Sequence, residues 1–329
     1  MNRLGHEQQK IYVQGISDEE RMLRKKLFLD LYFKYREKDE NSFIGQLSLT
    51  QRQRLHPLIL AVYKIKNRIG GFTHRVISDK RSPTNRPIIF TITHVGKFDI
   101  EVVSEVIRDH YYLLSGDYEH LQGIIDAPFL AANGVIYFNE TVKTDRQRAT
   151  ERMIAHLNMG GNLMFFPEGT WNLSENLPVL PCYWGIVNVA QQGNAIIVPI
   201  AAEQYGKHFD ICIGENMDLC TYGSTVEEKT RAIRDVRNTL ATLKWEIWES
   251  RPLQGRSEIA ESEWAEYLDA RFKEWTYFDL SYVDELVYRP KNIIPPREAF
   301  AHLKEIEPTI QNAFLWNKRL NGMPDYERI

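Results

Sequence analysis

Short apolar runs alternate with amphipathic segments through the middle of the chain. The apolar runs, rich in β-branched and aromatic residues, predict buried strands at residues 87–93, 111–114, 134–138, 162–166 and 195–200. The segments between them at residues 98–109 and 144–158 have helical spacing, and the second ends at Gly160-Gly161. This alternation predicts an α/β fold with a mainly parallel central sheet flanked by helices.

In the flanking regions the apolar residues recur at helical spacing instead. We predict helices over residues 18–34 and 50–67, followed by a proline-containing connector at residues 79–87. Beyond the middle part, Ser224 or Thr225 can cap a helix that runs to about residue 250, and residues 258–277 predict another. The chain is therefore expected to have three parts: a helical N-terminal segment (1–85), a catalytic core (86–223) and a helical C-terminal extension packed on the core (224–329).

Composition narrows the class of protein. The 329 residues are 43% hydrophobic and 26% charged, which is typical of a packed globular chain, and the net charge of -3 argues against nucleic acid as the main partner. The cysteines Cys182, Cys212 and Cys220 form no CxxC pair, which favours a reducing compartment and predicts a cytoplasmic protein.

Contact with lipid is expected from the surface only. The N-terminus lacks the apolar centre of a signal peptide, and no run of about 18 apolar residues predicts a spanning helix. Basic residues surround the apolar stripe of the helix at residues 19–34, so that helix either lies on the inner face of a membrane or packs as an ordinary surface helix.

The first candidate for chemistry follows the strand at residues 87–93. His94 and Asp99 are five residues apart, and Asp99 stands at the start of a predicted helix. A carboxylate on one ring nitrogen fixes the tautomer of an imidazole and leaves the other nitrogen free as a base. The spacing alone is more typical of a solvated loop histidine.

The second candidate is rarer by chance. The strand at residues 162–166 ends in Phe166-Pro167-Glu168-Gly169-Thr170. In a parallel sheet this motif and His94 lie at the same edge, where α/β proteins place their sites. The chain has no Gly-x-Ser-x-Gly elbow, dinucleotide fingerprint or metal-ligand spacing, so we expect neither a serine nucleophile nor a bound metal or cofactor.

Together, His94-x4-Asp99 and residues 166–170 resemble the glycerol-phosphate and lysophosphatidic acid acyltransferase superfamily. Residues 134–138 and 198–200 match further motifs of that family, and the resemblance covers roughly residues 75 to 215. It implies an O-acyltransferase of phospholipid biosynthesis that uses acyl-CoA or acyl carrier protein as donor and forms no acyl-enzyme.

The resemblance also implies residue roles. His94 would be the general base on the acceptor hydroxyl, Asp99 would orient it, and Glu168, Gly169 and Thr170 would bind the acceptor. Backbone amides near Gly96 or Gly169 are candidate donors to the developing oxyanion.

The chain departs from the family where acceptor phosphate is bound. Asn139-Glu140 and Trp171 stand where the family has arginines, which bind phosphate bidentately. Lys97 is a candidate replacement charge, as are Lys143, Arg146 and Arg148. Trp171 would equally suit a sugar or a larger apolar alcohol. Three functions therefore stay open: acylation of a glycerol-phosphate or lysophospholipid acceptor, acylation of a glycan or other non-phosphate alcohol, and non-catalytic lipid binding.

Overall fold

The computed structural model describes residues 18–96, 98–116, 127–139, 142–172 and 177–250. The described residues divide into two compact units. One draws on Met1–Ile59 and His110–Met153, and the other on Leu60–Asp109 and Ile154–Ile329. The expected helix at residues 258–277 lies outside the described residues. The expected boundaries at 85/86 and 223/224 stay a prediction.

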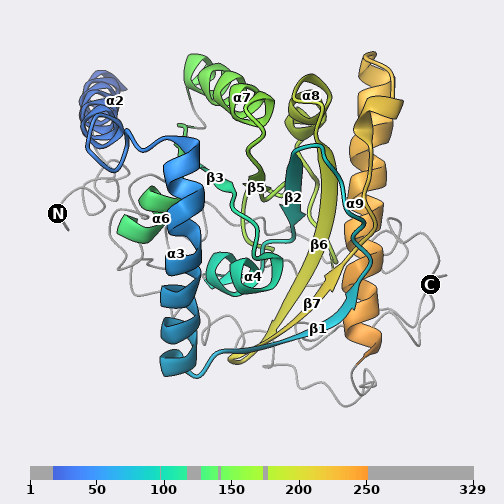
Figure 1. Ribbon diagram of the computed structural model, residues 1–329. Helices are drawn as coiled ribbons and strands as arrows, with labels where there is room; N and C mark the ends of the chain where they lie inside the picture. The colour runs from blue at the N-terminus through green and yellow to red at the C-terminus, as the bar shows by residue number, and fades with distance from the viewer. Residues whose placement is uncertain (1–17, 97, 117–126, 140–141, 173–176, 251–329) are drawn as a thin grey trace. The chain divides into compact units, whose positions relative to one another are not determined.

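The second unit contains a mainly parallel sheet (Figure 1). Its strands, in the order β1-β7-β6-β2-β5 across the sheet, are β1 (Thr73–Asp79), β7 (His208–Ile213), β6 (Ile196–Tyr205), β2 (Ile88–Ile92) and β5 (Leu163–Phe165). Three neighbouring pairs are parallel, and β6 and β7 are antiparallel. The predicted α/β fold with a mainly parallel sheet is confirmed.

The strand β2 lies inside this sheet, between β6 and β5, and its residues are almost wholly apolar. Phe90 pairs with Val198 on one side and Met164 on the other, and all three side chains are buried. Continuous apolar runs of this kind are typical of strands covered on both faces. The chain leaves β2 at Ile92, directly before Thr93 and His94.

The hairpin between β6 and β7 has a two-residue loop, Gly206-Lys207, closed by the pair Tyr205 and His208. Gly206 has φ +60°, as the first central position of a type II′ turn requires. The hairpin makes β7 antiparallel to β6, so β7 can pair in parallel with β1.

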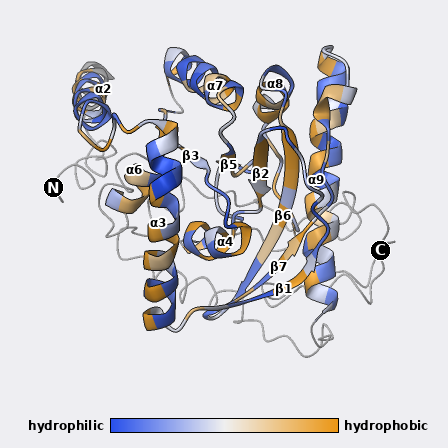
Figure 2. Cartoon of the chain, viewed as in Figure 1, coloured by the Kyte–Doolittle hydropathy of each residue, from blue (hydrophilic) through white to orange (hydrophobic). Residues whose placement is uncertain are grey.

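The longest helix of the second unit, α9 (Val226–Glu249), confirms the predicted helix after residue 224. The Thr225 hydroxyl caps it by accepting from the backbone N–H of Glu228 at 3.2 Å. Polar and apolar segments alternate along α9 in Figure 2, and its buried face packs against β6 and β7. Two shorter helices are α4 (Asp99–Ile107) and α8 (Gly185–Gln192).

The first unit contains α2 (Asp18–Glu40), α6 (Ala127–Asn133) and the parallel strands β3 (Tyr112–Ser115) and β4 (Val135–Tyr137). Tyr32 of α2 packs with Tyr137 of β4 in its core. Arg36 forms a bidentate ion pair with Asp145, at 2.6 and 2.7 Å, and both side chains are buried. A paired buried charge of this kind anchors α2 within its unit.

Two further helices, α3 (Leu49–Gly70) and α7 (Lys143–Asn158), have residues in both units. Within the described part of the chain, no helix combines the length and apolar composition needed to cross a bilayer.

Candidate active site

The carboxylate of Asp99 organises the turn that follows β2. Its Oδ2 lies 2.8 Å from Nδ1 of His94 and also accepts the backbone N–H groups of Val95 at 2.8 Å and Gly96 at 3.1 Å. Asp99 is the first residue of α4 and is fully buried. Because Oδ2 acts as the acceptor for all three groups, the proton of the neutral imidazole is assigned to Nδ1. Nε2 is then the basic nitrogen.

The ring of His94 is held on its faces by aromatic side chains. Phe166 stacks on it with ring centroids 4.1 Å apart and an angle of 28°, and Trp171 lies at 5.4 Å and 46°. The His94 side chain keeps 19% of its exposure, and no described residue makes a hydrogen bond to its Nε2. The imidazole is therefore fixed in place while its basic nitrogen is left for another molecule.

The carboxylate of Glu168 connects the two motifs. Its Oε1 accepts the backbone N–H of His94 at 2.9 Å, and its Oε2 accepts that of Leu180 at 2.7 Å. The carbonyl of His94 in turn accepts the N–H of Asn172 at 2.8 Å. Both backbone polar groups of His94 are thus held by the loop that follows β5, although the two motifs are more than 70 residues apart in the sequence.

Burial raises the pKa of the Glu168 carboxyl. The N–H groups of Leu180 and His94 act in the opposite direction, as does the charge of Lys244 and, when its ring is protonated, that of His94. Glu168 is only 3% exposed, and each of its oxygens already has a backbone donor. Its predicted role as a ligand of the acceptor stays a prediction, and the contacts present hold His94 instead.

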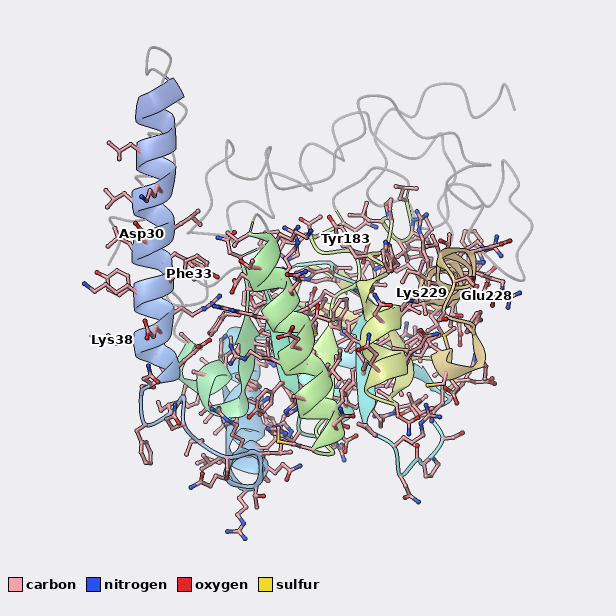
Figure 3. The ribbon with its side chains drawn as sticks, turned by 90° about the horizontal axis from the view of Figure 1, so that it is seen from above. Asp30, Phe33, Lys38, Tyr183, Glu228 and Lys229 are labelled. Atoms are coloured by element: carbon pink, nitrogen blue, oxygen red, sulfur yellow. The ribbon has the colours of Figure 1, made fainter. Side chains whose placement is uncertain are left out.

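A glycine is required directly after Glu168. Gly169 has φ +70°, and a Cβ built on it would lie 2.5 Å from the ring of Tyr183. The N–H of Tyr183 donates to the carbonyl of Pro167 at 2.9 Å, which keeps the tyrosine beside this turn. Tyr183 is 67% exposed, and Figure 3 labels it. Nothing in the sequence indicated a function for Tyr183. It lies beside the motif only because the folded chain brings it back to Pro167 and Gly169.

The amides of Gly96 and Gly169, candidates for the oxyanion donors, are both engaged within the protein. That of Gly96 donates to Asp99, and that of Gly169 donates to the carbonyl of Phe166 at 3.1 Å. In this structure the two amides therefore stabilise turns and are not available to a substrate oxygen.

The remaining candidates are distributed unevenly. Thr170 and Trp171 are partly exposed in the loop beside His94. Lys97 lies outside the described residues. Lys143, Arg146 and Arg148 belong to the first unit, whereas His94, Asp99 and residues 166–171 belong to the second. The structure thus brings together the two motifs and their aromatic neighbours.

The residues that form this site lie in a part of the chain that matches a known family. Residues 74–203 match the family model described as Acyltransferase. The matched residues include β2, β5 and both motifs, so the resemblance read from His94, Asp99 and residues 166–170 is confirmed.

A comparison with curated proteins found no match. Among solved structures, this chain is similar to the 1-acyl-sn-glycerophosphate (LPA) acyltransferase PlsC from Thermotoga maritima. The similarity has a TM-score of 0.48 and 17% identity, and it covers 70% of this chain and 98% of that chain.

Proposed function

We propose that the chain transfers a fatty acyl group from an acyl thioester to a hydroxyl of a glycerol-phosphate or lysophospholipid-type acceptor, with His94 as general base. The observation that carries this proposal is the 2.8 Å contact between Nδ1 of His94 and Oδ2 of Asp99, which leaves Nε2 as a free base at the end of β2. A hydroxyl is a weak nucleophile at neutral pH, and a positioned base accelerates its attack by about 10²–10⁴-fold.

The reaction follows from these positions. Nε2 of His94 takes the proton of the acceptor hydroxyl as its oxygen attacks the thioester carbonyl, and Asp99 stabilises the imidazolium that forms. Collapse of the tetrahedral intermediate breaks the carbon–sulfur bond and forms the ester. The imidazolium then returns the proton to the departing thiolate. No step consumes a cofactor.

The state of Cys182 supports direct transfer without an acyl-enzyme. Burial, and after it the charge of Glu168, raises the pKa of the Cys182 thiol. A thiol that stays protonated at neutral pH is a poor nucleophile. Cys182 is therefore not expected to attack the thioester, even though it lies two residues after Leu180, whose N–H donates to Glu168. We therefore propose that acyl-CoA or acyl carrier protein donates the acyl group directly to the acceptor.

A lipid acceptor would bring the protein to a membrane surface. We propose peripheral binding from the cytoplasmic side, at the inner face of the membrane. The exposed side chains of Leu23 and Leu27 on α2 support this proposal. They present apolar groups to solvent on a helix that also carries basic residues, and this combination can bind the surface of an anionic membrane.

A second candidate acceptor is a glycan or another alcohol without phosphate. The observation that favours it is Trp171, whose ring centroid lies 5.4 Å from that of His94 at a position where the family has an arginine. An acceptor screen distinguishes the two. The purified chain is incubated with a labelled acyl donor and lysophosphatidic acid, glycerol 3-phosphate, a neutral lysolipid or a glycan, and the products are identified by mass spectrometry. Acylation of the phosphate-containing acceptors supports the first function, and acylation of the others alone contradicts it.

The change Trp171→Arg tests the acceptor pocket. If Trp171 borders the acceptor, a guanidinium beside His94 should raise kcat/KM for lysophosphatidic acid relative to a neutral lysolipid by about tenfold, the value of one charge-assisted hydrogen-bonded contact. Trp171→Gln serves as the uncharged control. An unchanged ratio in the arginine variant, with its fold intact by circular dichroism, would show that Trp171 does not border the acceptor's phosphate.

The change Glu168→Gln tests the connection between the motifs. The amide keeps one acceptor oxygen but turns an NH₂ group toward the N–H of either His94 or Leu180. We expect kcat to fall on the order of 10–100-fold through displacement of His94, and the free energy of unfolding to fall by about 1–3 kcal/mol.

Steady-state kinetics and chemical denaturation measure the two effects of this change. Glu215→Gln, at an exposed glutamate of the same unit, is the matched control. A Glu168→Gln variant with unchanged kcat would contradict the role of this carboxylate in holding His94.

A further inference from the structure

A buried ion pair joins α9 to the end of β6. Lys244 is fully buried, and its Nζ lies 3.2 Å from Oε2 of Glu203, which is 4% exposed. The indole Nε1 of Trp248 donates to the same Glu203 oxygen at 3.1 Å. Lysine is almost never fully buried unless it is paired, so this pair calls for a physical explanation.

The ammonium of Lys244 also reaches the strand end beside His94. Nζ donates to the carbonyl of Ala202. The Thr93 hydroxyl lies 3.3 Å from that same carbonyl oxygen as a donor, and it accepts the N–H of Ala202 at 2.9 Å. Thr93 immediately precedes His94. The backbone of Ala202 is therefore bonded both to Lys244 and to the residue next to the proposed base.

The charge of Lys244 acts on a second group that holds His94. Glu168 binds the His94 N–H at 2.9 Å, and it can bind Leu180 as well only while both of its oxygens are acceptors. Burial favours its protonated form, and Lys244 is a cation that opposes this by lowering the pKa of Glu168. The charged groups that act on Glu168 are Lys244 and His94, and Lys244 is itself paired with Glu203. Glu168 and Arg237 act in turn on the Cys182 thiol.

We propose that Lys244 is a positioning residue for His94: it anchors Ala202, whose backbone bonds to the Thr93 hydroxyl directly before the proposed base. Lys244 lies on α9, beyond residues 74–203 that match the family. The proposal rests on the proposed function, because it concerns the same base. Through Lys244, α9 contributes to the position of the turn that carries His94.

Stability alone does not explain this pair. Replacement of a buried ion pair by uncharged groups of similar size is often neutral or stabilising, whereas removal of one partner leaves an uncompensated charge. Lys244→Met therefore tests activity and stability together. The double variant Lys244→Met with Glu203→Gln separates them, because it removes both charges of the pair but still leaves the Ala202 carbonyl without its donor from α9.

The readout is kcat measured against KM for the donor. Without Lys244 the carbonyl of Ala202 loses its donor from α9, and the strand end that leads to His94 loses an anchor. Displacement of the base should lower kcat on the order of 10–100-fold. We expect this in Lys244→Met and in the double variant, with KM for the donor unchanged.

Two controls complete the series. Lys244→Arg keeps a charged donor for the Ala202 carbonyl and should restore kcat toward the wild-type value. Lys229→Met removes a lysine from the same helix, about 22 Å along it at 1.5 Å per residue, and should leave kcat unchanged (Figure 3). A double variant with wild-type stability and wild-type kcat would overturn the proposal and leave the pair a purely structural one.

Hydrogen exchange keeps this inference separate from the proposed function. Absence of acyl transfer by the wild-type chain would contradict the function. In that case exchange at the backbone amides of residues 93–96 still decides the role of Lys244. Faster exchange there in the double variant than in Lys229→Met supports the proposal, and equal exchange overturns it.

Discussion

Replacement of Asp99 by Asn is expected to lower kcat by about 10³-fold while KM changes little. The amide oxygen of Asn can take the place of Oδ2 and keep the three N–H bonds from His94, Val95 and Gly96, so the tautomer of His94 is retained. The negative charge beside the imidazolium is lost. At a separation near 4 Å and an effective dielectric of 20 this charge is worth about 4 kcal/mol, or about 10³-fold in rate.

The same change places an NH₂ group where Asp99 has Oδ1. That oxygen is buried and has no hydrogen-bond partner among the described residues, so the new donor is also without an acceptor. We expect the free energy of unfolding to fall by about 1–3 kcal/mol. Steady-state kinetics with denaturant unfolding measures both effects, and the exposed Asp109→Asn is the control. An Asp99→Asn enzyme with wild-type kcat would show that this carboxylate does not support the base.

Strands with continuous apolar sequences could be predicted, because burial on both faces requires such sequences. The strands β2, β5 and β6 all follow this rule. The helix α9 could be predicted for a local reason as well, because Thr225 caps it and its apolar spacing is helical.

Elements that depend on distant partners could not be predicted. The strand β1, sequence THRVISD, is largely exposed and polar, and we expected a helical segment up to residue 85. It is a strand because it pairs in parallel with β7, more than 130 residues away. The strand β7, sequence HFDICI, was also missed. The helices α6 and α8 are short, and neither had a sequence signal that we recognised.

The candidate site also has contacts that could be predicted from the sequence and contacts that could not. The contact between His94 and Asp99 follows from their spacing, because five residues bring both to one turn. The bond from the His94 N–H to Glu168 does not, since it requires the register of β2 beside β5. Lys244 has no signal in the sequence at all, because a lysine in an amphipathic helix is normally exposed. Its burial becomes evident only where α9 packs on β6.

Replacement of His94 by Ala is expected to abolish acyl transfer while the fold remains. The base is lost, whereas the backbone groups of residue 94 can still bond to Glu168 and Asn172, which hold the turn. Removal of the ring leaves space beside Phe166 and Trp171, so a moderate loss of stability accompanies the loss of rate. His74→Ala, at an exposed histidine on β1, is the matched control.

The central claim is that the imidazole of His94 removes the proton from the acceptor hydroxyl. Its most direct test is the initial rate of ester formation by purified His94→Ala and wild-type chains at saturating donor and acceptor, with folding checked by circular dichroism. We predict a rate lower by about 10²–10⁴-fold in the variant. A folded His94→Ala chain that forms ester at the wild-type rate would contradict the mechanism.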